Sequence, residues 1–153
     1  MIITCSPGSV FSWNYFLEGS GHQAIWQKNW TSEQGSILID GEYFTIKKHG
    51  VTSGTWTMES DTQVLFTGVK ESVFKRSFQI EGSEKVFGLG AVSAFGRSFY
   101  LELDGDVVAM ISPKHAFTRK AEIEILDSSV EFPAVVFAFW LAILTWRRKR
   151  RKG

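Results

Sequence analysis

FPAVVFAFWLAILTW, at residues 132–146, is apolar except for Thr145, and RRKRRK follows it directly at residues 147–152. Pro133 near the start of this stretch and Asp127-Ser128-Ser129 before it are typical of a helix N-terminus. The stretch therefore predicts one helix over 132–146. Because its apolar residues go all the way round, this helix must be enclosed on every side, either by protein or by lipid.

The length of the helix helps to separate these two environments. Fifteen residues rise about 22 Å, whereas the hydrocarbon core of a bilayer is about 30 Å thick and takes about 20 residues to cross. Starting the helix at Ser128 lengthens it, but this places Glu131 in the apolar span at a cost of up to a few kcal/mol. The length favours a helix buried in protein, with a membrane anchor as the alternative.

The rest of the chain has the pattern of short β-strands, with turn residues about every ten positions and no helical period. Asp40-Gly41 and Asp104-Gly105 are dipeptides of tight hairpin turns, so neighbouring strands are expected to be antiparallel. The predicted strands are 13–18, 23–30, 36–40, 42–48, 54–59, 63–70, 73–80, 85–91, 98–103, 107–112 and 118–126.

About eleven or twelve antiparallel strands can close into a barrel that is too wide for its own wall side chains to fill. An apolar helix can fill such a barrel as a central plug. We therefore predict an all-β fold with one helix, in which a closed antiparallel barrel of 11–12 strands surrounds the C-terminal helix. The expected organisation is an N-terminal segment at 1–12, one barrel domain at 13–146 with its plug at 132–146, and a basic tail at 147–153.

Composition sets limits on the class of protein. The 153 residues suit one domain, and 44% apolar residues exclude a disordered chain. The single cysteine, Cys5, has no partner for an internal disulfide, and the N-terminus lacks the pattern of a signal peptide, which together favour a cytoplasmic location. Six of the 17 Lys and Arg residues lie in the tail, so the rest of the chain is acidic overall, which argues against nucleic acid as a partner.

The order of elements resembles the tubby-like superfamily, which includes the phospholipid scramblases and the LURP-one-related proteins. The local similarity lies in FYLELDGD at 99–106, RKAEIEIL at 119–126 and the apolar helix at 132–146. The resemblance implies a twelve-stranded barrel around a central helix and a binding module that attaches reversibly to phosphoinositide-bearing membranes. The chain lacks a matching phosphoinositide-contacting Lys/Arg pair and the acidic calcium loop of scramblases, so scrambling activity is not implied.

No catalytic, metal-binding or cofactor-binding constellation is predicted. His22, His49 and His115 are scattered without a second ligand at metal-binding spacing, and Cys5 has no recognisable base. The glycine-rich stretch 88–96 lacks the helix that follows a phosphate-binding loop, so it is interpreted as strand with a bulge or close backbone approach. We therefore expect a protein that is not an enzyme.

The candidate contact residues are the six basic residues of the tail. They exceed what a helix C-terminus needs and favour an anionic membrane lipid or an acidic protein surface. The contact residues are thus predicted to be Arg147, Arg148, Lys149, Arg150, Arg151 and Lys152. Trp13, Trp26, Trp30 and Trp56 are mostly expected in the core, with an exposed aromatic patch as the alternative. The leading hypothesis is a binding module, cytoplasmic and with the option of peripheral membrane attachment, and the alternative is a tail-anchored protein.

Overall fold

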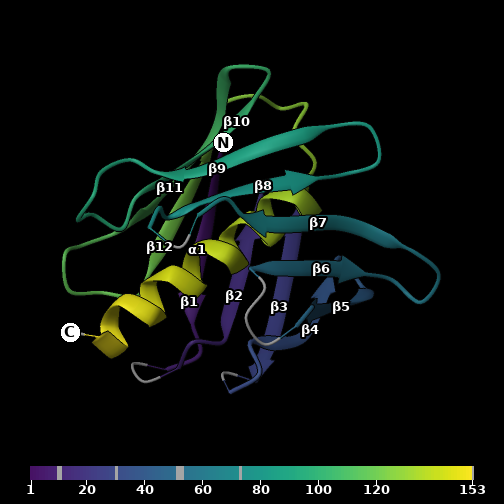
Figure 1. Cartoon of the computed structure of the whole chain (residues 1–153), viewed down its shortest axis with the longest axis horizontal. Helices are drawn as coiled ribbons and strands as arrows, with labels where there is room; N and C mark the ends of the chain where they lie inside the picture. Colours follow the sequence, from purple (N-terminus) through teal and green to yellow (C-terminus); the bar gives the residue numbers. More distant parts are fainter. Residues whose placement is uncertain (10–11, 30, 51–53, 73, 153) are drawn as a thin grey trace.

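The chain forms a closed antiparallel β-barrel with one helix inside it, as a computed structural model shows (Figure 1). The structure describes residues 1–9, 12–29, 31–50, 54–72 and 74–152, with the backbone alone described for 150–152. The strands are β1 (Ile2–Pro7), β2 (Tyr15–Gly19), β3 (His22–Asn29), β4 (Gln34–Ile39), β5 (Glu42–Lys48), β6 (Thr55–Glu59), β7 (Val64–Lys70), β8 (Ser77–Glu81), β9 (Val86–Ala91), β10 (Phe99–Leu103), β11 (Asp106–Pro113) and β12 (Ala121–Ile125), and the helix is α1 (Phe132–Lys152). The predicted fold class is confirmed.

Each strand pairs with its neighbours in sequence, and β1 closes the barrel by pairing with both β2 and β12. The sequence analysis placed residues 1–12 outside the barrel, and for Ile2–Pro7 this is wrong. Ile3 and Cys5 of β1 point into the core, and burial raises the pKa of the Cys5 thiol. A strand of six residues without a turn signal before it carries little local information, and its pairing with β12 joins distant parts of the chain.

Helix α1 runs through the barrel (Figure 1), and from Ala134 to Leu144 every side chain is almost completely buried. Of the two predicted environments, the structure therefore shows the protein interior. The helix does not end at Trp146 as predicted but continues to Lys152, so the basic residues form its last turns rather than a separate tail. Arg and Lys are good helix formers and are favourable near the negative end of the helix dipole. Within the described residues, no helix combines the length and apolarity that a membrane span requires.

Two glycines of the wall let the helix approach closely. A Cβ atom at Gly68 of β7 would lie 2.8 Å from Leu141 Cδ1. One at Gly35 of β4 would clash first with the Gln27 carbonyl oxygen of β3 and would also lie 2.9 Å from Trp140 Cη2. Around the helix, aromatic side chains fill the barrel: Trp26 packs against both Phe139 and Trp140, with ring centroids 5.4 and 5.2 Å apart. A wide barrel therefore keeps a dense core, because large rings and a helix share its interior.

The two hairpin turns that the sequence predicts, Asp40-Gly41 and Asp104-Gly105, are both present. Asp40 and Gly41 have φ of 49° and 86°, and Asp104 and Gly105 have φ of 53° and 86°, as the preferred two-residue turns require. The strands predicted at 73–80 and 118–126 begin later than expected, at Ser77 and Ala121, and residue 73 is not among those described. The glycine-rich stretch forms β9 and then a loop, without a following helix, so it does not have the form of a phosphate-binding loop.

Candidate functional site

The two ends of the barrel carry different connections. Because adjacent strands are antiparallel all round the barrel, every second connection lies at the same end. One end, here called the turn end, has the connections at 20–21, 40–41, 60–63, 82–85 and 104–105 and the segment that enters α1. The other end, here called the basic mouth, has the connections at 8–14, 30–33, 49–54, 71–76, 92–98 and 114–120, most of which are longer, and α1 from Trp146 onward.

Charge follows the same division. All but one of the 17 Lys and Arg residues lie in the basic mouth or in the last two residues of the strands that lead into it, and the exception is Lys85. All but three of the 16 Asp and Glu residues lie in or beside the turn-end connections, the three being Glu33, Glu71 and Glu122. The two groups of charges meet at Glu59, where Lys47 Nζ lies 3.4 Å from Oε1 and His49 Nε2 lies 3.9 Å from Oε2. A chain of nearly zero net charge is thus strongly bipolar.

Glu33 lies at the centre of the main ion-pair cluster of the mouth. Arg148 of α1 donates from Nε and Nη2 to its two carboxylate oxygens at 2.9 and 2.7 Å, and Lys48 Nζ donates to Oε1 at 2.8 Å. Burial alone would raise the pKa of Glu33, but the hydrogen bonds from Arg148 and Lys48 outweigh it and lower that pKa to about 2. The cluster fastens the end of α1 to the β3–β4 and β5 sides of the mouth.

Lys28 forms the floor of the mouth above the aromatic core. Its side chain is buried, its Nζ lies 4.0 Å from the centre of a Trp140 ring, and it donates to the Trp140 carbonyl at 3.5 Å. Burial lowers the pKa of Lys28, while the nearby Glu33 carboxylate acts in the opposite direction. A cation over an indole face is a favourable contact in a desolvated setting.

A repeated Phe-x-Arg sequence organises the other half of the mouth. It occurs as Phe74-Lys75-Arg76, Phe95-Gly96-Arg97 and Phe117-Thr118-Arg119 in three successive loops. Each Arg donates to backbone carbonyls of the loop that follows it round the barrel, in a series that ends in the loop at 8–14. The acceptors are Gly96 and Ser93 for Arg76, Thr118, His115 and Ala116 for Arg97, and Ser12 for Arg119, at 2.6–3.1 Å.

Helix α1 also donates hydrogen bonds to one of these loops. The indole Nε1 of Trp146 donates to the Arg97 carbonyl at 2.8 Å, and Lys149 Nζ donates to the Phe95 carbonyl. The Arg97 guanidinium carbon also lies 5.1 Å from the centre of the Trp146 ring. Guanidinium groups suit this task because their planar donors reach several carbonyls at once. The loops are consequently fixed to one another and to the helix through side chains.

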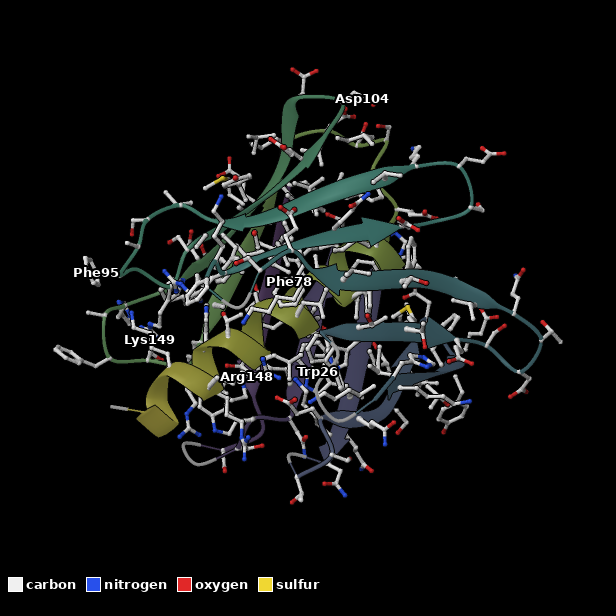
Figure 2. The ribbon with its side chains drawn as sticks, viewed as in Figure 1. Trp26, Phe78, Phe95, Asp104, Arg148 and Lys149 are labelled. Atoms are coloured by element: carbon white, nitrogen blue, oxygen red, sulfur yellow. The ribbon has the colours of Figure 1, made fainter. Side chains whose placement is uncertain are left out.

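In contrast to the Arg, the Phe side chain of each repeat is exposed to solvent. Phe74, Phe95 and Phe117 are 94%, 87% and 103% exposed, respectively. Figure 2 shows Phe95 at the outer edge of the molecule, near Lys149 and far from Asp104 of the turn end. An open cleft of about 610 Å³ lies between Phe95 and Phe117, with Trp13 and Trp146 also in its lining. The basic mouth therefore combines exposed aromatic rings with cationic side chains.

The six predicted contact residues have different surroundings. The Arg148 side chain is half-buried and forms an ion pair with Glu33. The Arg147 side chain is half-buried, and the Lys149 side chain is exposed. The side chains of Arg150, Arg151 and Lys152 lie outside the described part of the structure. All six belong to the basic mouth, but so do the loop residues Lys75, Lys114 and Lys120, which the sequence analysis did not select.

The tryptophans and histidines considered in the sequence analysis lie in different parts of the structure. Trp26 and Trp56 are buried as expected, Trp13 is partly buried below the Arg119 guanidinium, and Trp30 is outside the described residues. His22 of the turn end lies 2.7 Å from Asp40 and stacks on Phe132, and His49 contacts the Thr57 hydroxyl at 2.7 Å. His115 is exposed in the loop that Arg97 holds.

Comparisons of the chain with protein-family models, with curated proteins and with solved structures found no match.

Proposed function

We propose that this protein is a non-enzymatic binding module of the tubby-like kind, which binds the headgroups of anionic phospholipids through its basic mouth. The observation that carries the proposal is the separation of charge, with all but one of the 17 Lys and Arg residues at one end of the barrel. The contact surface is thus the whole mouth, in which the predicted residues 147–152 are one part.

The physical basis is additive electrostatics. Each Lys or Arg near an anionic membrane surface contributes about 1 kcal/mol of attraction, so several exposed residues suffice for attachment. The acidic turn end adds orientation, because a bipolar molecule approaches a negative surface with its basic end first. The loops are already fixed by the Phe-x-Arg contacts, so little ordering is needed on binding.

The alternative of a tail anchor is less well supported. The apolar residues that would have to enter a membrane are enclosed by the barrel, and withdrawing them would expose Trp26, Trp56 and Phe78 of the wall to water. An acidic protein would be attracted by the same charges. The tubby-like resemblance is the additional support for lipid, together with the barrel around a central helix.

A vesicle-sedimentation experiment tests the proposal. Full-length protein is mixed with vesicles of phosphatidylcholine alone or with added phosphatidylserine, at about 0.1 M and about 0.5 M salt, where screening differs about twofold in length. The charge variant replaces Lys75, Lys120, Arg150 and Arg151 by Gln, and leaves Arg148 in place because it pairs with Glu33. Lys85→Gln at the turn end is the matched control.

The wild-type protein is expected to bind the phosphatidylserine vesicles, more weakly at the higher salt. The charge variant should lose at least about tenfold in affinity, and Lys85→Gln should bind like the wild type. Absence of wild-type binding at low salt, or equal binding by the charge variant, would show that the basic mouth does not recognise anionic lipid.

A further inference from the structure

Three phenylalanines at the tips of the basic mouth lie outside the core. Phe74, Phe95 and Phe117 are each at least 87% exposed, whereas 13 other aromatic side chains of the described residues, among them Phe99, Phe137 and Phe139, form the buried core. Phe buries a large apolar area when it can, so three fully exposed rings at one end of a small barrel are typical of a contact surface.

The structure also holds these rings outward. In each repeat the Arg two positions after the Phe is drawn back onto the carbonyls of the next loop, and this leaves the Phe at the tip. Phe95 shows the arrangement most fully, because its loop is fixed by Arg76 on one side and its carbonyl by Lys149 of α1 on the other. The exposure is thus built into the loops.

We propose that Phe74, Phe95 and Phe117 insert together into the boundary between headgroups and acyl chains of an anionic bilayer. The inference rests on the proposed function and deepens it, from recognition of headgroups to penetration of the membrane. The three rings lie on loops at one end of the closed barrel, so a single flat surface can contact all of them. The Lys and Arg side chains between them then lie at headgroup level, where their charge is complementary to the lipid.

The arrangement favours a fluid surface over a folded partner. The three rings stand on separate loops that also carry Lys75, Lys114 and Lys120. A protein would need three matched pockets at fixed distances, since hot spots of protein interfaces are packed and desolvated. Lipid molecules rearrange round each ring without any such match, and interfacial insertion of aromatic and cationic side chains together is energetically favourable.

The first test compares a triple Phe variant of the full chain with a single-substitution control. Phe74→Ser, Phe95→Ser and Phe117→Ser are combined, and Tyr43→Ser on the outer face of β5 is the control, because Tyr43 is a 73% exposed aromatic away from the mouth. With phosphatidylserine vesicles, the triple variant should bind at least about tenfold more weakly, and its remaining binding should be more sensitive to salt. Tyr43→Ser should bind like the wild type.

The second test measures depth directly. Cys5 is the single cysteine and is completely buried, so a thiol-reactive fluorophore attached after Phe95→Cys labels the mouth selectively. Nitroxide groups on the lipid acyl chains should quench this fluorophore, and should not quench one attached after Tyr43→Cys. Full-length Cys5→Ser versions of both variants control for labelling of the native thiol.

The outcomes separate this inference from the proposed function. If the charge variant loses binding while the triple Phe variant binds like the wild type, or if the fluorophore at position 95 is not quenched, the membrane is bound without insertion and the inference is wrong. If the wild type binds no vesicles at all, the proposed function fails as well. Equal quenching at positions 43 and 95 would indicate adsorption without orientation and would also overturn the inference.

Discussion

The turn end and the basic mouth hold their connections in different ways. At the turn end, several connections are tight two-residue turns, such as Asp104-Gly105 with its two positive φ angles, and Asp40 also accepts from Gln23 N–H of the next hairpin. At the mouth, longer loops are fixed by side chains from other loops and from α1, as Arg97 fixes the loop at 114–120. A tight turn is set mainly by its own backbone conformation, whereas the longer loops are held at a few carbonyls, which leaves their tips available for another surface. The mouth is therefore the end to which the proposed function is assigned.

Among the substitutions in the basic mouth, replacement of Glu33 is expected to have the largest effect on stability. In Glu33→Gln, Arg148 and Lys48 lose the carboxylate between them, and the free energy of unfolding at pH 7 should fall by about 2 kcal/mol. Chemical denaturation followed by tryptophan fluorescence measures it. Asp40→Asn at the exposed turn end, which replaces a carboxylate that also accepts from a neighbour, should cost less than half as much.

The pH dependence of the unfolding free energy tests the Glu33 ion pair in a second way. The pKa of Glu33 is about 2 in the folded protein and 4.5 in the unfolded chain, so ionised Glu33 stabilises the fold above pH 4.5 and this contribution is lost as the pH falls towards 2. The difference in unfolding free energy between the wild type and Glu33→Gln should therefore shrink over that range. A constant difference from pH 6 to pH 3 would contradict the assigned ion pair.

The next effect concerns the series of arginines. Arg97→Lys keeps the charge but cannot reach three carbonyls with one planar group, so we expect a loss of about 1–2 kcal/mol in the free energy of unfolding. Amide hydrogen exchange in residues 114–120 should also become faster. Lys114→Arg, in the same loop and also conserving charge, is the control and should change neither quantity.

A smaller effect is expected at the turn end. Gly41 has a φ of 86°, and a Cβ atom there would meet nothing within 4 Å, so the cost of Gly41→Ala is conformational alone. About 1 kcal/mol is expected from denaturation curves. A loss greater than that of Arg97→Lys would show that the local turns, and not the contacts of the mouth, limit the stability of the barrel ends.

The smallest effect is expected where exposure is greatest. In the absence of membranes, Phe74→Ser, Phe95→Ser and Phe117→Ser should each change the free energy of unfolding by less than about 0.5 kcal/mol, because no side-chain packing is lost. Thermal and chemical unfolding of each variant measure this. A marked loss would mean that the rings support the loops, and it would weaken their assignment to a membrane.

The sequence predicts the barrel well where the signals are local. Asp40-Gly41 and Asp104-Gly105 mark real turns, and the apolar residues on all sides of 132–146 indicate enclosure. The sequence does not predict β1, because Ile2–Pro7 is short and its role depends on pairing with β12 at the far end of the barrel.

The site is harder to predict because its contacts join distant residues. Glu33 and Arg148 are 115 positions apart in the chain, and nothing near either residue indicates the pair. Counting charges over the whole body gave an acidic average, which concealed an acidic end and a basic end. The Phe-x-Arg repeat was the available signal, since its three copies recur once per hairpin, but a three-residue pattern gains meaning only when the topology brings its copies to the same rim.

The helix at the centre of the barrel also constrains the order of folding. Hairpins with local turns, such as β4–β5, can form early, but their apolar faces stay uncovered until α1 enters and β1 meets β12. Contacts between segments so far apart close slowly, and uncovered strands aggregate in the meantime. During synthesis this chain therefore exposes its core for longer than a helical bundle of equal size, and we expect its yield to depend on chaperones and temperature more than its final stability does.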